Sequence, residues 1–239
     1  MRDEAIYDAA FVRGLFDEMS GTYGIVNVVS SFGFCVRWRR QCVDGIAIAP
    51  DSTVCDLMSG TGELWPSIAR RLSPAGRITA VDFSPAMTTR AKAKAQGVKV
   101  PIEILMDDAL SGVLPDDMAD VIVCSFGLKT LEHEQLRRLA REVARVLKPG
   151  GRLSFVEISV PGSPWLSALY MFYVRRVIPL IGWLLLGNPE DYRLLGVYTE
   201  KFSNCDQFGR FCADAGLRVR PRSLFWGCAT GVVGERLHA

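Results

Sequence analysis

The chain has 239 residues, 49% of them hydrophobic, and a formal net charge of +2. These values suit one α/β domain with a full core and exclude a disordered chain, and so weak a charge predicts no nucleic-acid partner. Seven cysteines without a Cys-x-x-Cys pair and only two histidines offer no ligand set for a metal, so reduced thiols in a cytosolic protein are expected.

The first part of the chain does not look like an export signal. Residues 1–5 lack the basic and then apolar pattern of a signal peptide. No cleaved export is therefore expected, and the expected location is the cytoplasm. Residues 1–50 are expected to form a largely helical extension that covers the domain behind it.

From Thr53 onward, strand patterns alternate with helical ones, which predicts a mostly parallel sheet with helices on both faces. The expected strands are residues 53–57, 77–81, 102–106, 120–125 and 152–158. The expected helices are residues 64–72, 86–96 and 132–147. A helix near 205–215 and closing strands at 217–224 and 225–233 complete a single domain, with its core in 51–159 and its C-terminal part in 204–239.

A glycine turn follows the first strand. Asp56 ends the strand, and the loop Ser59-Gly60-Thr61-Gly62 comes directly behind it. Glycines lack a Cβ and can adopt a positive φ, so this backbone can lie against a bulky ligand. A dinucleotide loop needs a third glycine three residues later, but position 65 is Trp65. A pyrophosphate is therefore not the expected ligand.

The second and third strands also lead into carboxylates. Asp82 lies about 20 residues after the first glycine, the spacing at which Rossmann-like folds place an acidic residue on a ribose diol. Asp108 follows the third strand and can accept a hydrogen bond from an exocyclic amine, although Asp107 can also be the ligand. Together with the glycine loop, this pattern resembles a class I S-adenosylmethionine (SAM) methyltransferase.

Further motifs make the chain similar to the ubiquinone/menaquinone biosynthesis C-methyltransferase (UbiE-type) family. That resemblance implies a Rossmann-like class I fold with a seven-stranded sheet, mostly parallel but with an antiparallel last strand, and SAM as cofactor. The motifs are Tyr23-x3-Asn27-x3-Ser31-Phe32-Gly33 with Arg37-Trp38-Arg39, then Ser125-Phe126-Gly127-Leu128, residues 146–152, and residues 157–161.

The resemblance and the strand ends together define the predicted cofactor site. It comprises Asp56, Ser59, Gly60, Thr61, Gly62, Asp82, Phe83, Asp108, Ala109 and Ser125. One departure concerns the acceptor instead: the family typically carries Arg-Asn where this chain has Lys129-Thr130. Arginine offers a planar fork of donors and lysine a point charge, so the exchange puts the quinone substrate in doubt without affecting SAM binding.

A sulfonium methyl group is already activated, so the enzyme mainly has to orient the acceptor and exclude water. Methylation of a ring carbon also requires a base that removes the ring proton. The candidates for catalytic residues are Lys129, Glu157, His133 and Tyr23.

Residues 160–203 form an insert before the last helix, expected to be helical and to cover the acceptor. Its aromatic density favours a hydrophobic, lipid-like acceptor or a surface that rests on a membrane. Its longest apolar run, 177–187, is shorter than the ~20 residues that span a bilayer. A homodimer and a peripheral membrane contact remain open.

The predicted function is SAM-dependent methylation, at carbon, of a prenylated quinol precursor. The alternatives are C-methylation of a prenyl diphosphate or other terpenoid, N-methylation of a phospholipid amine, and a non-catalytic partner in a biosynthetic assembly.

Overall fold

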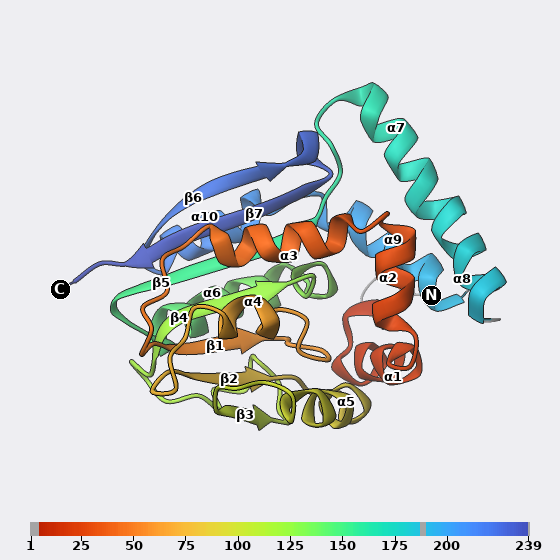
Figure 1. Ribbon diagram of the computed structural model, residues 1–239. Helices are drawn as coiled ribbons and strands as arrows, with labels where there is room; N and C mark the ends of the chain where they lie inside the picture. Colours follow the sequence, from red (N-terminus) through yellow and green to blue (C-terminus); the bar gives the residue numbers. More distant parts are fainter. Residues whose placement is uncertain (1–4, 187–189, 239) are drawn as a thin grey trace.

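A seven-stranded sheet organises the computed structural model, which describes residues 5–186 and 190–238 (Figure 1). The strand order is β3-β2-β1-β4-β5-β7-β6. β1 to β5 pair in parallel, and β7 runs antiparallel to both of its neighbours, β5 and β6, as predicted. The strands are β1 (Thr53–Leu57), β2 (Arg77–Val81), β3 (Ile102–Leu105), β4 (Ala119–Ser125), β5 (Leu147–Ile158), β6 (Leu217–Leu224) and β7 (Ala229–Arg236).

Helices cover both faces of the sheet. One hydrophobic cluster joins the strands to α6 (His133–Val146) and α10 (Asp206–Asp214), through side chains such as Leu139 and Phe208. A second cluster lies on the other face, where Val43 of α3 (Phe34–Asp44), Ile68 of α4 (Trp65–Ala69) and Ala91 of α5 (Pro85–Ala95) pack together. The class I architecture predicted from the motifs is thus confirmed.

The remaining helices gather beyond the carboxyl ends of the parallel strands, at the right of Figure 1. We call them the roof: α1 (Ala9–Met19), α2 (Tyr23–Ser30), α7 (Pro164–Phe172), the π turn Tyr173–Val177, α8 (Ile178–Leu186) and α9 (Glu190–Phe202).

A third apolar cluster holds the roof together, and it joins residues from near the N-terminus to residues of the insert. The Tyr173 hydroxyl donates to the Ser30 carbonyl at 2.6 Å, and the Tyr198 hydroxyl donates to the Ile6 carbonyl at 2.5 Å. Within the described residues, no helix is both long and apolar enough to cross a membrane.

The second closing strand differs from the sequence prediction. It begins at Ala229 rather than 225, because Phe225–Gly227 forms a tight turn in which Phe225 and Trp226 have φ angles of 45° and 55°. The apolar pair therefore ends one strand instead of beginning the next. The structure shortens the predicted helix at 64–72 to Trp65–Ala69.

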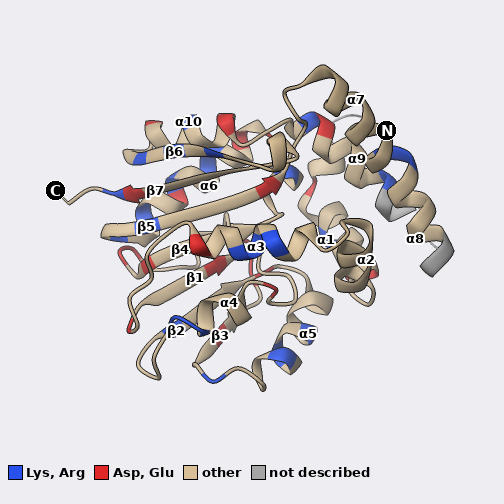
Figure 2. Cartoon of the chain, turned by 45° about the horizontal axis from the view of Figure 1, so that its top comes forward, with Lys and Arg blue, Asp and Glu red and all other residues tan. Residues whose placement is uncertain are grey.

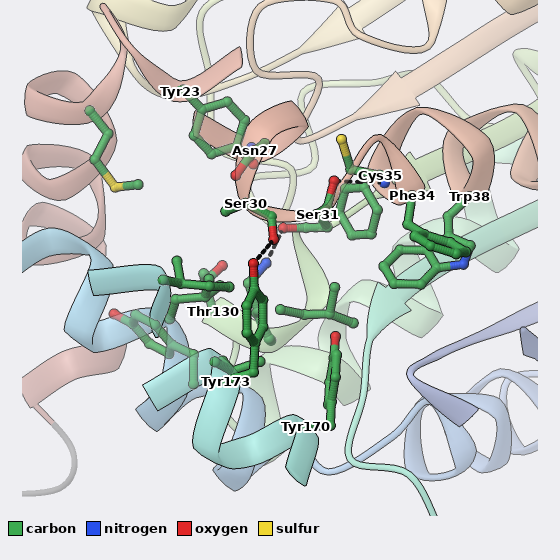
Figure 3. A pocket seen from close by; sticks show the side chains of 18 of the residues that line it. Tyr23, Asn27, Ser30, Ser31, Phe34, Cys35, Trp38, Thr130, Tyr170 and Tyr173 are labelled. Carbon is green, nitrogen blue, oxygen red and sulfur yellow. Dashed lines mark hydrogen bonds between the residues drawn. The ribbon is translucent and has the colours of Figure 1, made fainter. Parts of the chain in front are cut away.

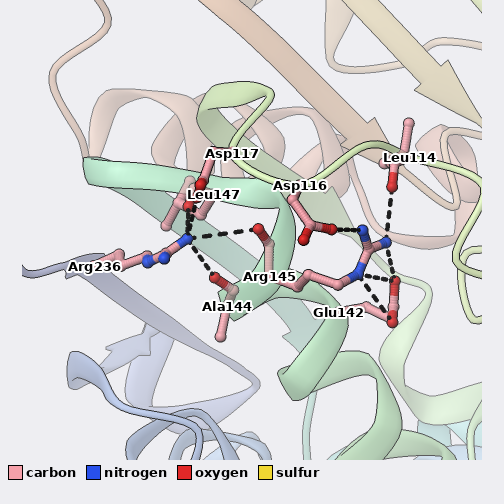
Figure 4. Close-up of polar contacts among 8 residues, drawn as sticks. All are labelled: Leu114, Asp116, Asp117, Glu142, Ala144, Arg145, Leu147 and Arg236. Atoms are coloured by element: carbon pink, nitrogen blue, oxygen red, sulfur yellow. Dashed lines mark hydrogen bonds and ion pairs between the residues drawn. The ribbon is translucent and has the colours of Figure 1, made fainter.

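Ion pairs fasten the opposite end of the sheet (Figure 4). Arg145 of α6 contacts Glu142 at 2.6 Å and donates to the Leu114 carbonyl at 2.8 Å, and its carboxylate partners raise its pKa. Arg236 of β7 donates to the Leu147 carbonyl at 2.6 Å. Partly exposed ion pairs of this kind contribute at most about 1 kcal/mol each to the stability of the fold.

Candidate active site

Asp82 fixes the glycine loop. It lies at the end of β2, where one carboxylate oxygen accepts from the Gly60 amide at 2.7 Å and the other from the Ser84 amide at 3.0 Å. Burial raises the pKa of Asp82, and the two amide bonds partly oppose that shift. The carboxylate therefore joins the loop after β1 to the end of β2.

The structure favours glycine at the two loop positions for different reasons. Gly60 has a φ of 55° and open space where a Cβ would lie, so its backbone is free to approach a ligand. Gly62 has a φ of 79°, and a Cβ there would meet the Trp65 ring at 2.5 Å. Trp65, the residue that replaces the third dinucleotide glycine, thus packs directly under the loop.

Asp56 serves this tryptophan. Its carboxylate accepts from the Trp65 indole nitrogen at 3.0 Å, and burial raises its pKa to about 8. Asp56 does not line the pockets described below, and neither do Ser59, Thr61 and Gly62. These four residues of the predicted cofactor site flank or support Gly60, the loop residue that lines the donor side.

Six of the ten predicted cofactor residues line one hollow, which we call the donor pocket. They are Gly60, Asp82, Phe83, Asp108, Ala109 and Ser125. Asp107 lines the same pocket, so the structure leaves both acidic residues available as the ligand. Asp108 accepts from the Leu110 amide at 2.9 Å, and Asp107 accepts from the Asp108 amide at 2.7 Å, so each carboxylate has one oxygen bonded to the backbone.

The donor pocket fits a nucleoside with a charged tail. The Ser59 hydroxyl is buried without a hydrogen-bond partner, and the space beside Gly60 is open. Buried polar atoms normally have partners, so this hydroxyl is available to a ligand. Asp82 and the pair Asp107 and Asp108 supply acceptors for hydroxyl and amine groups at two strand ends.

A larger apolar cavity of about 340 Å³ lies between the sheet and the roof (Figure 3). We call it the acceptor pocket. Aromatic and aliphatic side chains from α1, α2, α3 and the insert form most of its wall. They include Leu15, Met19, Phe34, Trp38, Tyr170, Tyr173, Val174 and Ile178.

The two pockets meet at four residues. Phe16, Tyr23, Phe126 and Thr130 line both of them. The Phe16 and Tyr23 rings contact edge to face with centroids 6.0 Å apart. A donor in one pocket and an acceptor in the other would therefore face each other at this junction.

Lys129 is the one charged residue among those that line the acceptor pocket in the described structure. Its ammonium group donates to the Phe126 carbonyl at 2.6 Å and lies 3.2 Å from Glu157. Glu157 is fully buried and also accepts from the amides of Lys129 and Ile158. Burial raises the pKa of Glu157, and the Lys129 charge opposes the rise.

The four candidates for catalytic residues thus have different positions. Tyr23 lies at the junction, Lys129 lines the acceptor pocket, and Glu157 lies behind Lys129. His133 lies elsewhere: its ring packs against Phe211 of α10 with centroids 4.8 Å apart, and it lines neither pocket.

Besides the predicted site residues, the structure places Thr130, Tyr170 and Tyr173 in the wall of the acceptor pocket. The signal for Thr130 was its place beside Lys129 in the motif after β4. The two tyrosines were visible only as part of an aromatic insert.

Comparison with known proteins agrees with this geometry. A SAM-dependent methyltransferase from Aquifex aeolicus has the same fold, with a TM-score of 0.57 and 23% identity over 83% of this chain and 89% of its own. A putative methyltransferase in complex with Trm112 from Haloferax volcanii gives a TM-score of 0.64 at 16% identity, over 93% and 98% of the two chains. The fold is thus that of class I methyltransferases.

The chain belongs to the ubiE/COQ5 methyltransferase family, whose model matches residues 4–234. It is 33% identical over 222 residues to the demethylmenaquinone methyltransferase of Thermus thermophilus, covering 93% of this chain and all of that protein. It is also 33% identical to the ubiquinone/menaquinone biosynthesis C-methyltransferase UbiE of Geobacter sulfurreducens, over 94% and 88% of the two chains. The protein is therefore a SAM-dependent methyltransferase.

Proposed function

We propose that this enzyme transfers the methyl group of SAM to a ring carbon of a prenylated quinol precursor. The observation that carries the proposal is the junction of the donor pocket with a cavity of about 340 Å³ walled by apolar and aromatic side chains. Relatives named for demethylmenaquinone and for ubiquinone/menaquinone biosynthesis support this substrate class. We assign residues 1–50 and 160–203 the role of covering the acceptor.

Bound SAM supplies an activated methyl group on a sulfonium. Phe16 and Phe126 shield the junction from water, and Tyr23 is placed to hydrogen-bond a hydroxyl of the acceptor. A quinol hydroxyl that loses its proton makes the ring carbon nucleophilic, and the Lys129 ammonium stabilises that anion. After the new carbon–carbon bond forms, the ring proton leaves, so the net products are the methylated quinol, S-adenosylhomocysteine and one proton.

The charge of the acceptor pocket suits a head group with at most one negative charge. Lys129 is its single charged lining residue among those described, and Glu157 already balances that charge. A diphosphate or a phospholipid phosphate would need further cations for its negative charge. This balance supports a quinol over the prenyl diphosphate and phospholipid alternatives.

The decisive assay incubates the enzyme and labelled SAM separately with a demethyl-quinol, a prenyl diphosphate and phosphatidylethanolamine. We expect label in the quinol alone, and its position on a ring carbon in the product. Label in either phosphate-bearing lipid, and not in the quinol, would refute the substrate assignment. An Asp82→Ala variant, in which SAM binding is expected to weaken at least roughly tenfold by calorimetry, tests the donor site separately.

We also propose a cytoplasmic location with peripheral contact to a membrane; the lipid-like acceptor supports the membrane contact. Homodimer formation stays a prediction.

A further inference from the structure

Exposed apolar side chains surround the mouth of the acceptor pocket. They come from three segments that are distant in sequence: the turn between α2 and α3, helix α7, and the turn between β6 and β7. We call this set the docking rim: Phe32, Trp165, Leu169, Phe172, Phe225 and Trp226. Phe32 and Phe225 also line the pocket, so the rim is continuous with the cavity wall.

Contacts between the segments hold the rim in one piece. Phe225 packs on Phe34, the first residue of α3, with ring centroids 4.3 Å apart, and Phe32 lies 6.0 Å from Tyr173 beside α7. A Cβ on Gly227 would lie 3.4 Å from Pro161, which leads into α7. The three segments therefore meet around one opening.

Helix α7 is apolar on two sides. Its inner side chains Leu166 and Tyr170 pack toward the pocket, whereas Trp165, Leu169 and Phe172 form an outward stripe at spacings of four and three residues. Trp165 is 90% exposed. A helix without a polar face is normally buried on all sides, so the outward stripe requires a partner that the described part of the chain does not provide.

Three aromatic residues of the rim have an unfavourable backbone conformation. Phe32, Phe225 and Trp226 have φ angles of 48°, 45° and 55°, in the left-handed region that bulky residues seldom adopt. Phe32 is 79% and Trp226 77% exposed, so core packing does not explain these conformations. Strained residues of this kind concentrate at functional surfaces.

The charges around the rim select the partner. Segments 28–34, 161–177 and 223–228 contain no aspartate or glutamate, and helix α7 carries neither charge colour in Figure 2. Their charged residues are Arg175, which pairs with Glu200 of α9, and Arg176. Tryptophans beside basic residues are typical of the boundary between lipid headgroups and acyl chains. A second copy of the chain seated here would instead close the mouth through which a lipid-like acceptor enters.

We propose that the docking rim rests on the surface of an anionic lipid bilayer, and that the acceptor passes from the bilayer through the rim into the pocket. The identity of the acceptor in this inference rests on the proposed function. The contact with the bilayer can be measured without knowing the acceptor. Trp165 and Trp226 enter the interface, and Arg176 lies at headgroup level.

The test is cosedimentation of the full chain with vesicles of phosphatidylcholine alone or mixed with phosphatidylglycerol. We expect the double variant Trp165→Ser/Trp226→Gly to bind the mixed vesicles at least roughly tenfold more weakly than the parent. Leu237→Ser removes an exposed apolar side chain near the C-terminus, at the far end of the molecule (Figure 1), and should change binding by less than about twofold. Arg176→Gln should weaken binding to the anionic vesicles alone.

Equal vesicle binding by the double variant and the parent, or no binding by the parent, would overturn the proposal. Loss of a dimer instead of loss of vesicle binding would also overturn it, since the rim would then be an interface between copies. Methylation of a short-chain, water-dispersible quinol separates the two proposals. The rim variants should retain that activity and lose methylation of a long-chain quinol held in vesicles, whereas failure with both quinols in the parent counts against the proposed function only.

Discussion

Asp56 is a buried carboxyl group that lines neither pocket. It supports the Trp65 indole under the glycine loop, and its pKa is raised to about 8, first by burial and further by the negative charge of Asp82. The folded protein therefore holds a proton here that the unfolded chain releases near pH 4. This contribution to stability is complete below about pH 4 and is lost as pH rises toward 8.

Replacing Asp56 with asparagine should make this effect visible. Asparagine keeps an acceptor for the indole and removes the charge, so Asp56→Asn should gain stability relative to the parent as pH rises from about 5 to 8. The gain has an upper limit of about 5 kcal/mol and should level off above pH 8. Urea unfolding at a series of pH values measures it. A difference between the two proteins that does not vary with pH would show that Asp56 titrates normally.

Trp226 carries a backbone penalty that glycine would remove. Its φ of 55° costs a non-glycine residue roughly 1–2 kcal/mol, and its exposed ring contributes little burial in return. Trp226→Gly should therefore raise the free energy of unfolding by roughly 0.5–1 kcal/mol, after the greater entropy of unfolded glycine is subtracted.

The matched control is Trp165→Gly, the same exchange at an exposed site within helix α7. Glycine disfavours a helix, so this variant should lose roughly 0.5–1 kcal/mol. Thermal unfolding of both variants measures the two opposite signs. A loss of stability in Trp226→Gly would mean that the turn depends on ring contacts and not on its backbone.

Among the elements, the strands of the core were the most predictable from sequence. β1, β2 and β6 begin and end where alternating or continuous apolar runs meet a turn signal. The start of β7 was not predictable, because Phe225 and Trp226 have strong strand propensity and only the three-dimensional turn puts them in the left-handed region. For the roof, the sequence predicted helices but not their arrangement, because an apolar helix pattern does not say what the helix packs against.

The roof elements depend on a few polar bonds, and Tyr173 makes one of them. Its hydroxyl joins the insert to the carbonyl of Ser30 at the end of α2 (Figure 3). Tyr173→Phe removes this bond and keeps the ring, so the local opening of α2 and the π turn should become easier by about 1 kcal/mol, or roughly fivefold in amide exchange. Hydrogen exchange with mass spectrometry measures this. Exchange in β1 and β4 should not change, and a uniform increase across the sheet would contradict a local role.

At the scale of the whole molecule, the site forms where segments that are distant in sequence meet in space. The donor pocket was largely predictable, since parallel strands bring their carboxyl ends to one edge. The acceptor pocket was not, because its wall joins residues from α1 and α2 to residues of the insert, and no local pattern pairs segments so distant in sequence. Sequence reasoning named Tyr23, Lys129 and His133 as candidates for catalysis. The structure places Tyr23 and Lys129 in the wall of the acceptor pocket, whereas His133, at the start of α6, packs against Phe211 of α10.

We expect the sheet and the roof to unfold as two cooperative parts. The roof cluster is distinct from the two clusters on the faces of the sheet, and the acceptor pocket lies between roof and sheet. A smaller fourth cluster joins them, since Leu166 and Tyr170 of α7 pack with Val156 of β5. Apolar side chains around a cavity lose packing contacts, so the roof should open at lower free energy than the sheet. An acceptor that fills the cavity and binds only the closed roof should stabilise it by about 2.7 kcal/mol at 100 times its Kd, which slows roof opening roughly 100-fold. Limited proteolysis with a short-chain quinol measures this as delayed cleavage within 160–203. S-adenosylhomocysteine, which is expected to occupy the donor pocket, serves as the control and should protect that segment much less. Equal protection by both ligands would mean that roof and sheet open as one unit.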